Sequence, residues 1–416
     1  MKFTVYRDVL SKSLRRCDLK GGALGNPALT GTALSARRVP DLPGGLDLRA
    51  TNGLLGVATM VACNTEVEGD VFVNTKQLAT VVNMMPPGTL TLETPEPEVL
   101  VVSNGKRRWR GKTMPLANVK PMPEPEGKAV LRLSAEDFLA ALGRVGFVVP
   151  NVSAEHSFRL GILLDAPGDA LSSVVVGEHM IAVSRLQTPC TGKWRGLIPE
   201  IALAHARDIA TEEEKGHVEI FASANYTWIQ NSSTFLMYCP PPGEYLDWRT
   251  MLAHVTHEPV CRLPRLAVLE TLKAVCVASP DAEPRTWLQV QDDASVAIDH
   301  TDREAVITFH DNITVTDLAK GALPSFLINA AYFRDAIDAA GGDPVLNYVD
   351  DRHVSLTTED GFVWTCALIH PDAGERPPSG GVSVSKPPQT AAEAAPAAAP
   401  PSEPEKPKRS RRKPAK

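Results

Sequence analysis

Two histidines, His254 and His257 in the segment HVTH, are the side chains best spaced to share a metal ion. Imidazole is a common ligand of zinc and other transition metals. A zinc site needs at least a third protein ligand, and this pair has none nearby at a matching spacing. We therefore expect no metal site and no cofactor.

Enzyme motifs are also missing from the sequence. It contains no GxSxG, no phosphate-binding Gly loop and no HExxH. The acidic runs 212–214, 292–293 and 359–360 stand beside turn signals, so we interpret them as solvated loops rather than as a carboxylate pair that faces a substrate. The sequence predicts a non-catalytic protein.

A repeated unit organises the chain instead. It consists of a short apolar strand, an Asn or Pro, an amphipathic helix, a Gly turn and a second strand. Its three copies are GDVFVNTKQLATVVNMMPPGTLTLE (69–93), RGLIPEIALAHARDIATEEEKGHVEIF (195–221) and PSFLINAAYFRDAIDAAGGDPVLNY (324–348). Asn74, Pro199 and Asn329 hold the same place, at intervals of 125 and 130 residues. Asn is a good helix N-cap and Pro is tolerated in the first turn. Because solenoid repeats are only about 20 to 50 residues long, this period predicts three repeated domains.

Smaller signals complete the domain division. A strand at KFTV precedes a helix from about Arg7 to Leu19, Asn104-Gly105 marks a hairpin turn, and Ser134 with Asp137 predicts a helix cap. The Pro-rich segment 121–127 is the first linker. The expected domains are residues 1–125, 128–256 and 259–372, followed by a Pro/Ala-rich tail at 373–416 that we expect to be disordered.

Charge is divided unevenly between the tail and the rest of the chain. The net charge is −6, and from Gly374 onward nine Lys or Arg stand against four Asp or Glu, so the tail carries +5 and the remainder −11. The basic end of the tail could bind nucleic acid or act only as a solubilising segment. The seven cysteines form no CxxC pair, and neither a signal peptide nor an apolar membrane span is recognisable, which predicts a cytoplasmic protein with reduced thiols.

The order and spacing of several segments resemble the β subunit of bacterial DNA polymerase III, the sliding clamp. The segments are MKFTVYRDVLSKSL at the start, Leu46 to Glu93, SNGKRRWRGKTMP and GEHMIAVSRL, and the resemblance covers residues 1 to about 371. It implies an α+β fold of three clamp domains, with helices lining a channel and antiparallel sheets outside. Two chains would form a head-to-tail homodimeric ring around double-stranded DNA. The implied function is that of a processivity factor, found with the nucleoid, that tethers DNA polymerase, clamp loader and other partners.

The resemblance also implies residue roles. Sliding needs only weak phosphate contacts from cations on the inner helices. The DNA-binding candidates are Lys12, Arg15, Arg16, Lys20, Lys76, Arg144, Arg207 and Lys273, with Arg334 as a further cation. For each of them the alternative is a solvated surface charge. The loop at 20–26 lacks the Arg that many clamps present to DNA, so the grip on DNA is expected to be weaker than usual.

A hydrophobic pocket for partner peptides is implied between the second and third domains. The family motif TDGHRLA aligns with VGEHMIA at 176–182. The pocket candidates are Arg159, Val176, His179, Met180, Ile181, Leu246, Met251, Thr365 and Ala367. For the apolar residues, burial in the core is the alternative.

The protomer contact in this family joins the first domain to the third domain of the partner. By match, Trp109 lies on the first side, and Cys276 and Val277 lie on the second. The alternative for Trp109 is a surface ring stacked by neighbouring arginines. A second function also stays open: a clamp-derived interaction scaffold, or an accessory or resistance clamp, that encircles DNA weakly.

Overall fold

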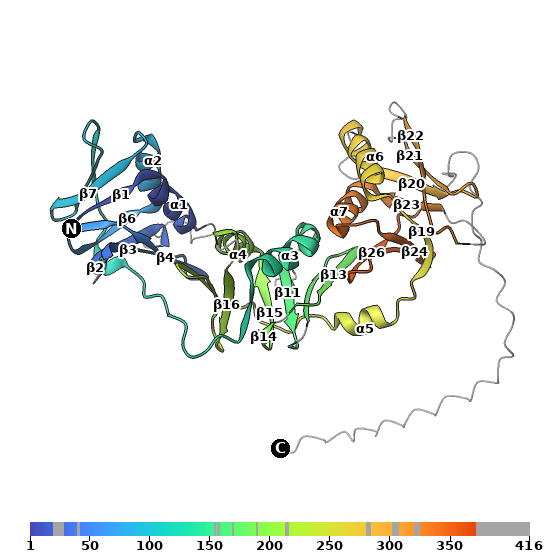
Figure 1. The fold of residues 1–416 in the computed structure, drawn as a ribbon, viewed down its shortest axis with the longest axis horizontal. Coiled ribbons are helices and arrows are strands. Elements are labelled where there is room, and N and C mark those ends of the chain that lie inside the picture. Colours follow the sequence, from blue (N-terminus) through green and yellow to red (C-terminus); the bar gives the residue numbers. More distant parts are fainter. Residues whose placement is uncertain are drawn as a thin grey trace, which may run out of the picture.

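The computed structural model describes residues 1–19, 29–39, 42–153, 155, 159–168, 170–188, 190–212, 216–279, 284–301, 308–319 and 325–371. The chain forms an arc of three α+β domains in sequence order (Figure 1). Helices follow the concave edge of the arc, and most of the sheet area lies outside them (Figure 1).

The first domain packs two helices against antiparallel strands. Its elements are β1 (Lys2–Tyr6), α1 (Arg7–Cys17), β2 (Gly31–Val39), β3 (Leu42–Thr51), β4 (Leu55–Ala62), β5 (Asn64–Val67), β6 (Gly69–Asn74), α2 (Thr75–Met84), β7 (Thr89–Glu96), β8 (Val99–Ser103) and β9 (Arg108–Lys112). Helix α1 ends at Cys17, two residues before the expected end, and the hairpin of β8 and β9 forms where Asn104-Gly105 predicts it. Apolar side chains of both helices, among them Leu10, Leu14 and Leu78, are buried in the core of this domain.

The second domain repeats the arrangement. Its elements are β10 (Leu131–Ser134), α3 (Ala135–Val145), β11 (Gly161–Ala166), β12 (Leu171–Val176), β13 (Met180–Leu186), β14 (Thr191–Gly192), β15 (Trp194–Pro199), α4 (Glu200–Glu212), β16 (His217–Ala222), β17 (Thr227–Gln230) and β18 (Thr234–Tyr238). A short helix, α5 (Trp248–Ala253), follows and lies on the opposite side of the arc from α3 and α4 (Figure 1).

The third domain has the same plan. Its elements are β19 (Glu258–Arg262), α6 (Arg265–Ala278), β20 (Arg285–Val290), β21 (Ser295–Thr301), β22 (Thr308–Thr314), β23 (Ser325–Asn329), α7 (Ala330–Ala340), β24 (Val345–Asp350), β25 (His353–Thr357) and β26 (Phe362–Ala367). The expected tail, and Pro324 at the start of the third repeat copy, lie outside the described residues.

The capping residues behave as local signals predict, with one exception. The Asn74 side chain accepts a hydrogen bond from the Gln77 N–H at 3.0 Å, and Asn329 caps α7 in the same way. Ser134 accepts the Asp137 N–H at 3.0 Å. Pro199, however, is the last residue of β15 and precedes α4 rather than lying in its first turn.

Continuous sheets join the domains. A nine-stranded sheet has the order β14-β10-β16-β17-β18-β4-β3-β2-β6, so β18 of the second domain pairs with β4 of the first. An eight-stranded sheet has the order β15-β11-β12-β13-β26-β25-β24-β19, so β13 pairs with β26 of the third domain. The remaining sheets, β5-β1-β7-β8-β9 and β22-β21-β20-β23, end at strands β9 and β22. Backbone hydrogen bonds therefore hold both joints of the arc.

Candidate functional site

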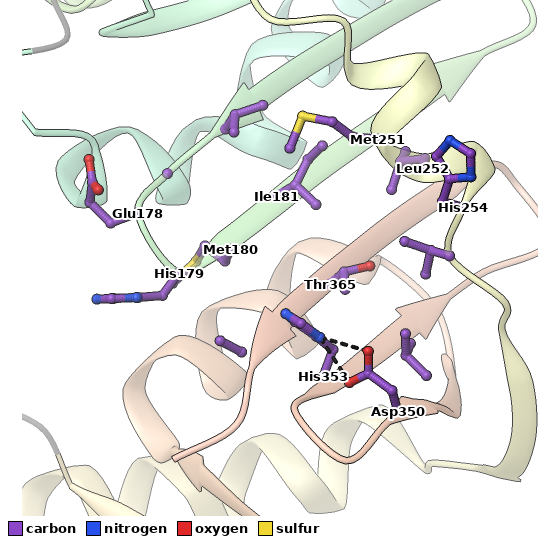
Figure 2. Close-up of a pocket in the computed structure, with 15 residues that line it drawn as sticks. Glu178, His179, Met180, Ile181, Met251, Leu252, His254, Asp350, His353 and Thr365 are labelled. Carbon is purple, nitrogen blue, oxygen red and sulfur yellow. Dashed lines mark hydrogen bonds and ion pairs between the residues drawn. The ribbon is translucent and has the colours of Figure 1, made fainter. Parts of the chain in front are cut away.

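A pocket of about 320 Å³ lies at the joint between the second and third domains. Strand β13 and the short helix α5 form one side, and β24, β25 and β26 form the other (Figure 2). The β13–β26 pairing, with Met180 opposite Cys366 and Ile181 opposite Thr365, fixes the relative position of the two sides. This volume lies at the lower end of the range for ligand pockets, about 300 to 1,000 Å³.

The apolar part of the pocket rests on a packed cluster. Val176, Met180 and Ile181 are nearly buried, whereas Met251 on α5 is 44% exposed. Beneath them, Val176 and Ile181 pack with the buried Trp248, and Leu246 joins this cluster at its edge. A Met side chain adapts its shape to different apolar groups, so this surface can accommodate an apolar side chain of a ligand.

Tyr245 holds the segment before α5 against the sheet. Its hydroxyl accepts a hydrogen bond from the Val176 N–H at 3.0 Å. Burial raises the pKa of Tyr245 to about 12, so the phenol stays neutral at physiological pH. Asp247 then caps α5 by accepting the Thr250 N–H, which places Met251 and Leu252 over the pocket.

Two acidic side chains stand at the polar rim (Figure 2). Glu178 accepts a hydrogen bond from the Arg159 guanidinium at 2.8 Å. Asp350 contacts the His353 imidazole at 2.9 Å and also accepts the Arg352 N–H at 2.7 Å. Partial burial raises the pKa of Asp350, but these hydrogen bonds outweigh it and the pKa is lowered overall, so the carboxylate is ionised at neutral pH.

The structure brings most of the pocket candidates together. Val176, His179, Met180, Ile181, Met251, Thr365 and Ala367 all line the pocket. Arg159 and Leu246 do not: Arg159 lies behind the rim as the partner of Glu178, and Leu246 packs beneath the floor. His254, Asp350 and His353 also line the pocket but were not among the pocket candidates. His254 is the C-cap of α5 and was considered only as a metal ligand, and no local pattern shows that the turn with Asp350 and His353 faces β13. That the pocket binds peptides stays a prediction.

Two of the DNA-binding candidates on α1 are engaged at the joint between the first and second domains. Lys12 forms an ion pair with Glu212 at the end of α4 at 2.7 Å, and Arg16 forms another with the same carboxylate. The Arg16 side chain is only 7% exposed, so Arg16 is not a solvated surface charge, which was the alternative to a DNA contact. Glu212 is likewise not a solvated loop residue, because it ends a helix and neutralises two cations. Glu213 and Glu214 lie outside the described residues.

Arg144 and Arg207 are engaged in a similar way. Arg144 on α3 pairs with Asp360 in the turn between β25 and β26, which links the second domain to the third. Glu359, the other residue of the acidic run at 359–360, forms an ion pair with Arg262. Both acidic residues of this run therefore take part in ion pairs. Arg207 donates to the Leu142 carbonyl at 3.2 Å and thereby ties α4 to α3.

Three further candidates are exposed on helices of the concave edge: Arg15 on α1, Lys76 on α2 and Lys273 on α6. Lys12 and Arg207 are exposed as well, although they form the contacts described above. Arg334 on α7 is half-buried and contacts its neighbour Asp335 at 2.6 Å. Lys20 lies outside the described residues. DNA binding by any of these residues stays a prediction.

The candidate protomer contacts lie in the first and third domains, at opposite ends of the arc (Figure 1). Trp109 is half-buried on β9 and packs against the core of the first domain. Its ring covers Gly111, where an added Cβ would lie 2.0 Å from Trp109 Cη2. On α6, Cys276 is partly buried, and the Val277 side chain is 88% exposed.

The described part of the chain was also searched for metal sites and for membrane-spanning helices. No group of three or more His, Cys, Asp or Glu side chains there is arranged to hold a metal ion. His254 lines the pocket and His257 contacts the Ser355 hydroxyl at 2.7 Å. No described helix combines the length and apolar character needed to cross a membrane.

Comparison with known proteins gives one relative in sequence and many in structure. No protein-family model matches the chain. A β sliding clamp from Rickettsia felis is 22% identical over 213 residues, which cover 50% of this chain and 56% of the relative. The matched segment thus spans little more than half the length of that relative.

Solved structures match over nearly their whole length. A DNA polymerase III β subunit from Eubacterium rectale has a TM-score of 0.77 at 15% identity, covering 89% of this chain and 99% of that one. A sliding clamp from Pseudomonas aeruginosa bound to griselimycin has a TM-score of 0.76 at 18% identity, with 89% and 99% covered. At these identities the structural matches show a shared fold.

Proposed function

We propose that this divergent homologue of the non-catalytic β sliding clamps is itself a DNA sliding clamp, a processivity factor that encircles duplex DNA and tethers DNA-processing proteins. The observation that carries the proposal is the arc of three clamp domains with paired helices along its concave edge (Figure 1). Two such arcs joined end to end would enclose a channel lined by helices. DNA would then be held by topology, which requires few specific contacts.

The ends of the arc support closure by a second copy of the chain. Within the described residues, strands β9 and β22 each end a sheet, so each presents an edge with which a partner strand can pair. Strand β9 carries Arg108 and Arg110, which form ion pairs with Glu93 and Glu96 of β7, and a hollow between α6 and β22 is lined by Glu270 and Asp311. The proposed contact joins the first domain of one protomer to the third domain of its partner, with the half-buried Trp109 facing the exposed Val277.

The interdomain pocket is the proposed binding site for partner peptides. Its apolar floor and the exposed, adaptable side chain of Met251 suit a short peptide with an apolar anchor. The partners that we propose are a DNA polymerase, a clamp loader and other proteins that carry a clamp-binding motif. Within the cell such a protein would act in the cytoplasm, at the nucleoid.

One observation favours a second function, that of an interaction scaffold with weak encirclement of DNA. Lys12, Arg16 and Arg144 form ion pairs at the joints between domains, so their charges are not available to phosphates without breaking those pairs. Such a scaffold would still bind partners in the pocket but would not be held on DNA by a closed ring.

Retention on DNA separates the two functions. Light scattering first measures the mass in solution, and the protein is then loaded on nicked circular plasmid, half of which is linearised. A dimer that stays on circles and leaves linear ends establishes a topological clamp. A monomer, or equal retention on both forms that salt or removal of residues 373–416 abolishes, supports the scaffold and ordinary electrostatic binding.

A further inference from the structure

The charges around the interdomain pocket are unevenly distributed. Among the described residues that line it, the acidic ones are Glu178 and Asp350, and none is Lys or Arg. The other polar groups are three histidines and Thr365. An incoming peptide therefore meets an apolar floor beside a rim of negative charge.

The two acids are not equivalent. Glu178 pairs with the guanidinium of Arg159, an obligate cation that is 11% exposed and approaches from outside the pocket. Among the described residues, the side-chain partner of Asp350 is an imidazole, and the Asp350 side chain is 54% exposed. An imidazole, unlike a guanidinium, is not an obligate cation. Asp350 thus keeps more of its negative charge for a ligand than Glu178 does.

Neighbouring groups strengthen the negative field at Asp350. Burial and a hydrogen bond to Asp351, together with the charges of Asp350 and Glu258, raise the pKa of Tyr348 to about 12. The exposed Arg352 lies in the same turn but does not line the pocket. Asp350, Asp351 and Glu258 therefore all lie near the Tyr348 phenol, and of these three carboxylates Asp350 is the one that lines the pocket.

We propose that the pocket selects peptides in which an apolar anchor is flanked by Lys or Arg, and that Asp350 is the residue that recognises the cation. The apolar anchor lies on Met180, Ile181 and Met251, and the flanking cation lies against the Asp350 carboxylate at the domain 3 side (Figure 2). The proposal rests on the proposed peptide-binding function of this pocket, which it makes more specific. An exposed ion pair adds modest affinity, but it discriminates strongly between charges because a like charge is repelled.

Fluorescence anisotropy with the full chain tests the proposal. The probes are labelled peptides with the partly apolar sequence QLxLF, in which x is any residue. In each peptide the residues on either side of this sequence are Lys, Gln or Glu. We expect the Lys peptides to bind about threefold to tenfold more tightly than the Gln peptides at low salt, and the Glu peptides to bind more weakly. In Asp350→Asn the three affinities should converge, because Asn keeps the oxygen that accepts the Arg352 N–H but not the charge.

A matched control is Asp8→Asn, which removes an exposed carboxylate from α1 in the first domain. It should leave the preference for Lys unchanged. Equal binding of Lys, Gln and Glu peptides, or a preference that persists in Asp350→Asn, overturns the charge selection but leaves the pocket as a peptide site. If no peptide binds, and Met180→Ala leaves this result unchanged, the pocket is not a peptide-binding site. The proposed charge selection is then excluded as well.

Discussion

Arg16 on α1 forms an ion pair with Glu212 at the end of α4, and this contact crosses from the first domain to the second. Lys12, one helical turn earlier, contacts the same carboxylate. Two cations that the sequence suggested for DNA binding therefore brace the joint of the arc. The curvature of the concave edge depends on side-chain contacts here as well as on the β4–β18 strand pairing.

Replacing Glu212 by Gln should weaken this joint. The substitution leaves the nearly buried Arg16 guanidinium without a counter-charge, which should lower the free energy of unfolding by about 2 to 3 kcal/mol. Urea titration followed by circular dichroism measures the loss, and hydrogen exchange should show faster opening of α1 and α4 than of α6 and α7. The control Asp8→Asn removes an exposed carboxylate from α1 and should be nearly neutral. An unchanged urea midpoint in Glu212→Gln would show that the pair is dispensable.

Acidification should loosen both joints together. Burial raises the pKa of Glu212, but its bonds to Lys12 and Arg16 outweigh that effect and the pKa is lowered overall. For Asp360, burial is likewise outweighed by the bonds to Arg144 and Thr358, so its pKa is also lowered. A carboxylate with a lowered pKa in the folded state stabilises the fold above its unfolded pKa, near 4, and this stabilisation is lost as pH falls through the folded value.

The measurement is the urea midpoint between pH 6 and pH 3. The parent chain should lose stability steeply below about pH 4, and a Glu212→Gln, Asp360→Asn double variant should show a shallower loss from a lower starting value. If the two curves run parallel throughout, other carboxylates cause the acid sensitivity.

Local signals in the sequence predicted local structure well. The caps at Asn74, Ser134 and Asn329 form because a side chain and the N–H groups it accepts are only two or three residues apart. The contacts that join the domains have no such signal. Thr59 and Thr234 share a buried hydrogen bond across 175 residues, and only tertiary structure brings them together.

In the candidate site, too, the residues of a local sequence motif were predictable and those brought in by tertiary structure were not. The segment 176–182 was predicted to line the pocket because it aligns with a family motif, and most of it does. Asp350 and His353 come from a turn that has no counterpart in that motif, so their position was not predictable. The ion pair of Arg16 was not predictable, because helical spacing shows which face a residue lies on but not which acidic residue of another domain will cover that face.

The salt dependence of DNA binding should distinguish cations that contact phosphates from cations that form ion pairs within the protein. Arg15, Lys76 and Lys273 are exposed on helices of the concave edge. If they contact phosphates, each Ala variant should reduce the slope of log K for duplex DNA against log salt by about 0.9. The control is Lys193→Ala, an exposed lysine next to β14 on the opposite side of the second domain from α3 and α4 (Figure 1). Equal slopes in all four variants would remove these three residues from the DNA-binding set.

Substitutions at the Trp109 indole test whether two chains close into a dimeric ring, and they leave the pocket and the concave edge unchanged. The ring lies over Gly111, where even a methyl group would approach within 2.0 Å, so Gly111→Ala must displace the indole. Trp194 covers Gly196 in β15 in the same way, with a nearest approach of 2.2 Å to an added Cβ, and it lies in the second domain away from both ends of the arc. Gly196→Ala is therefore a control with matched chemistry.

If Trp109 inserts into the partner's third domain, it should behave as a large aromatic anchor. Trp109→Ala should raise the dimer dissociation constant by about 30-fold or more, as expected for an anchor worth about 2 kcal/mol, and Gly111→Ala should raise it less. Sedimentation velocity over a dilution series measures both changes, with far-UV circular dichroism confirming that each variant is folded. Gly196→Ala should dimerise like the parent chain. Trp109→Ala and Gly111→Ala chains that also dimerise like the parent would show that Trp109 does not anchor the protomer contact.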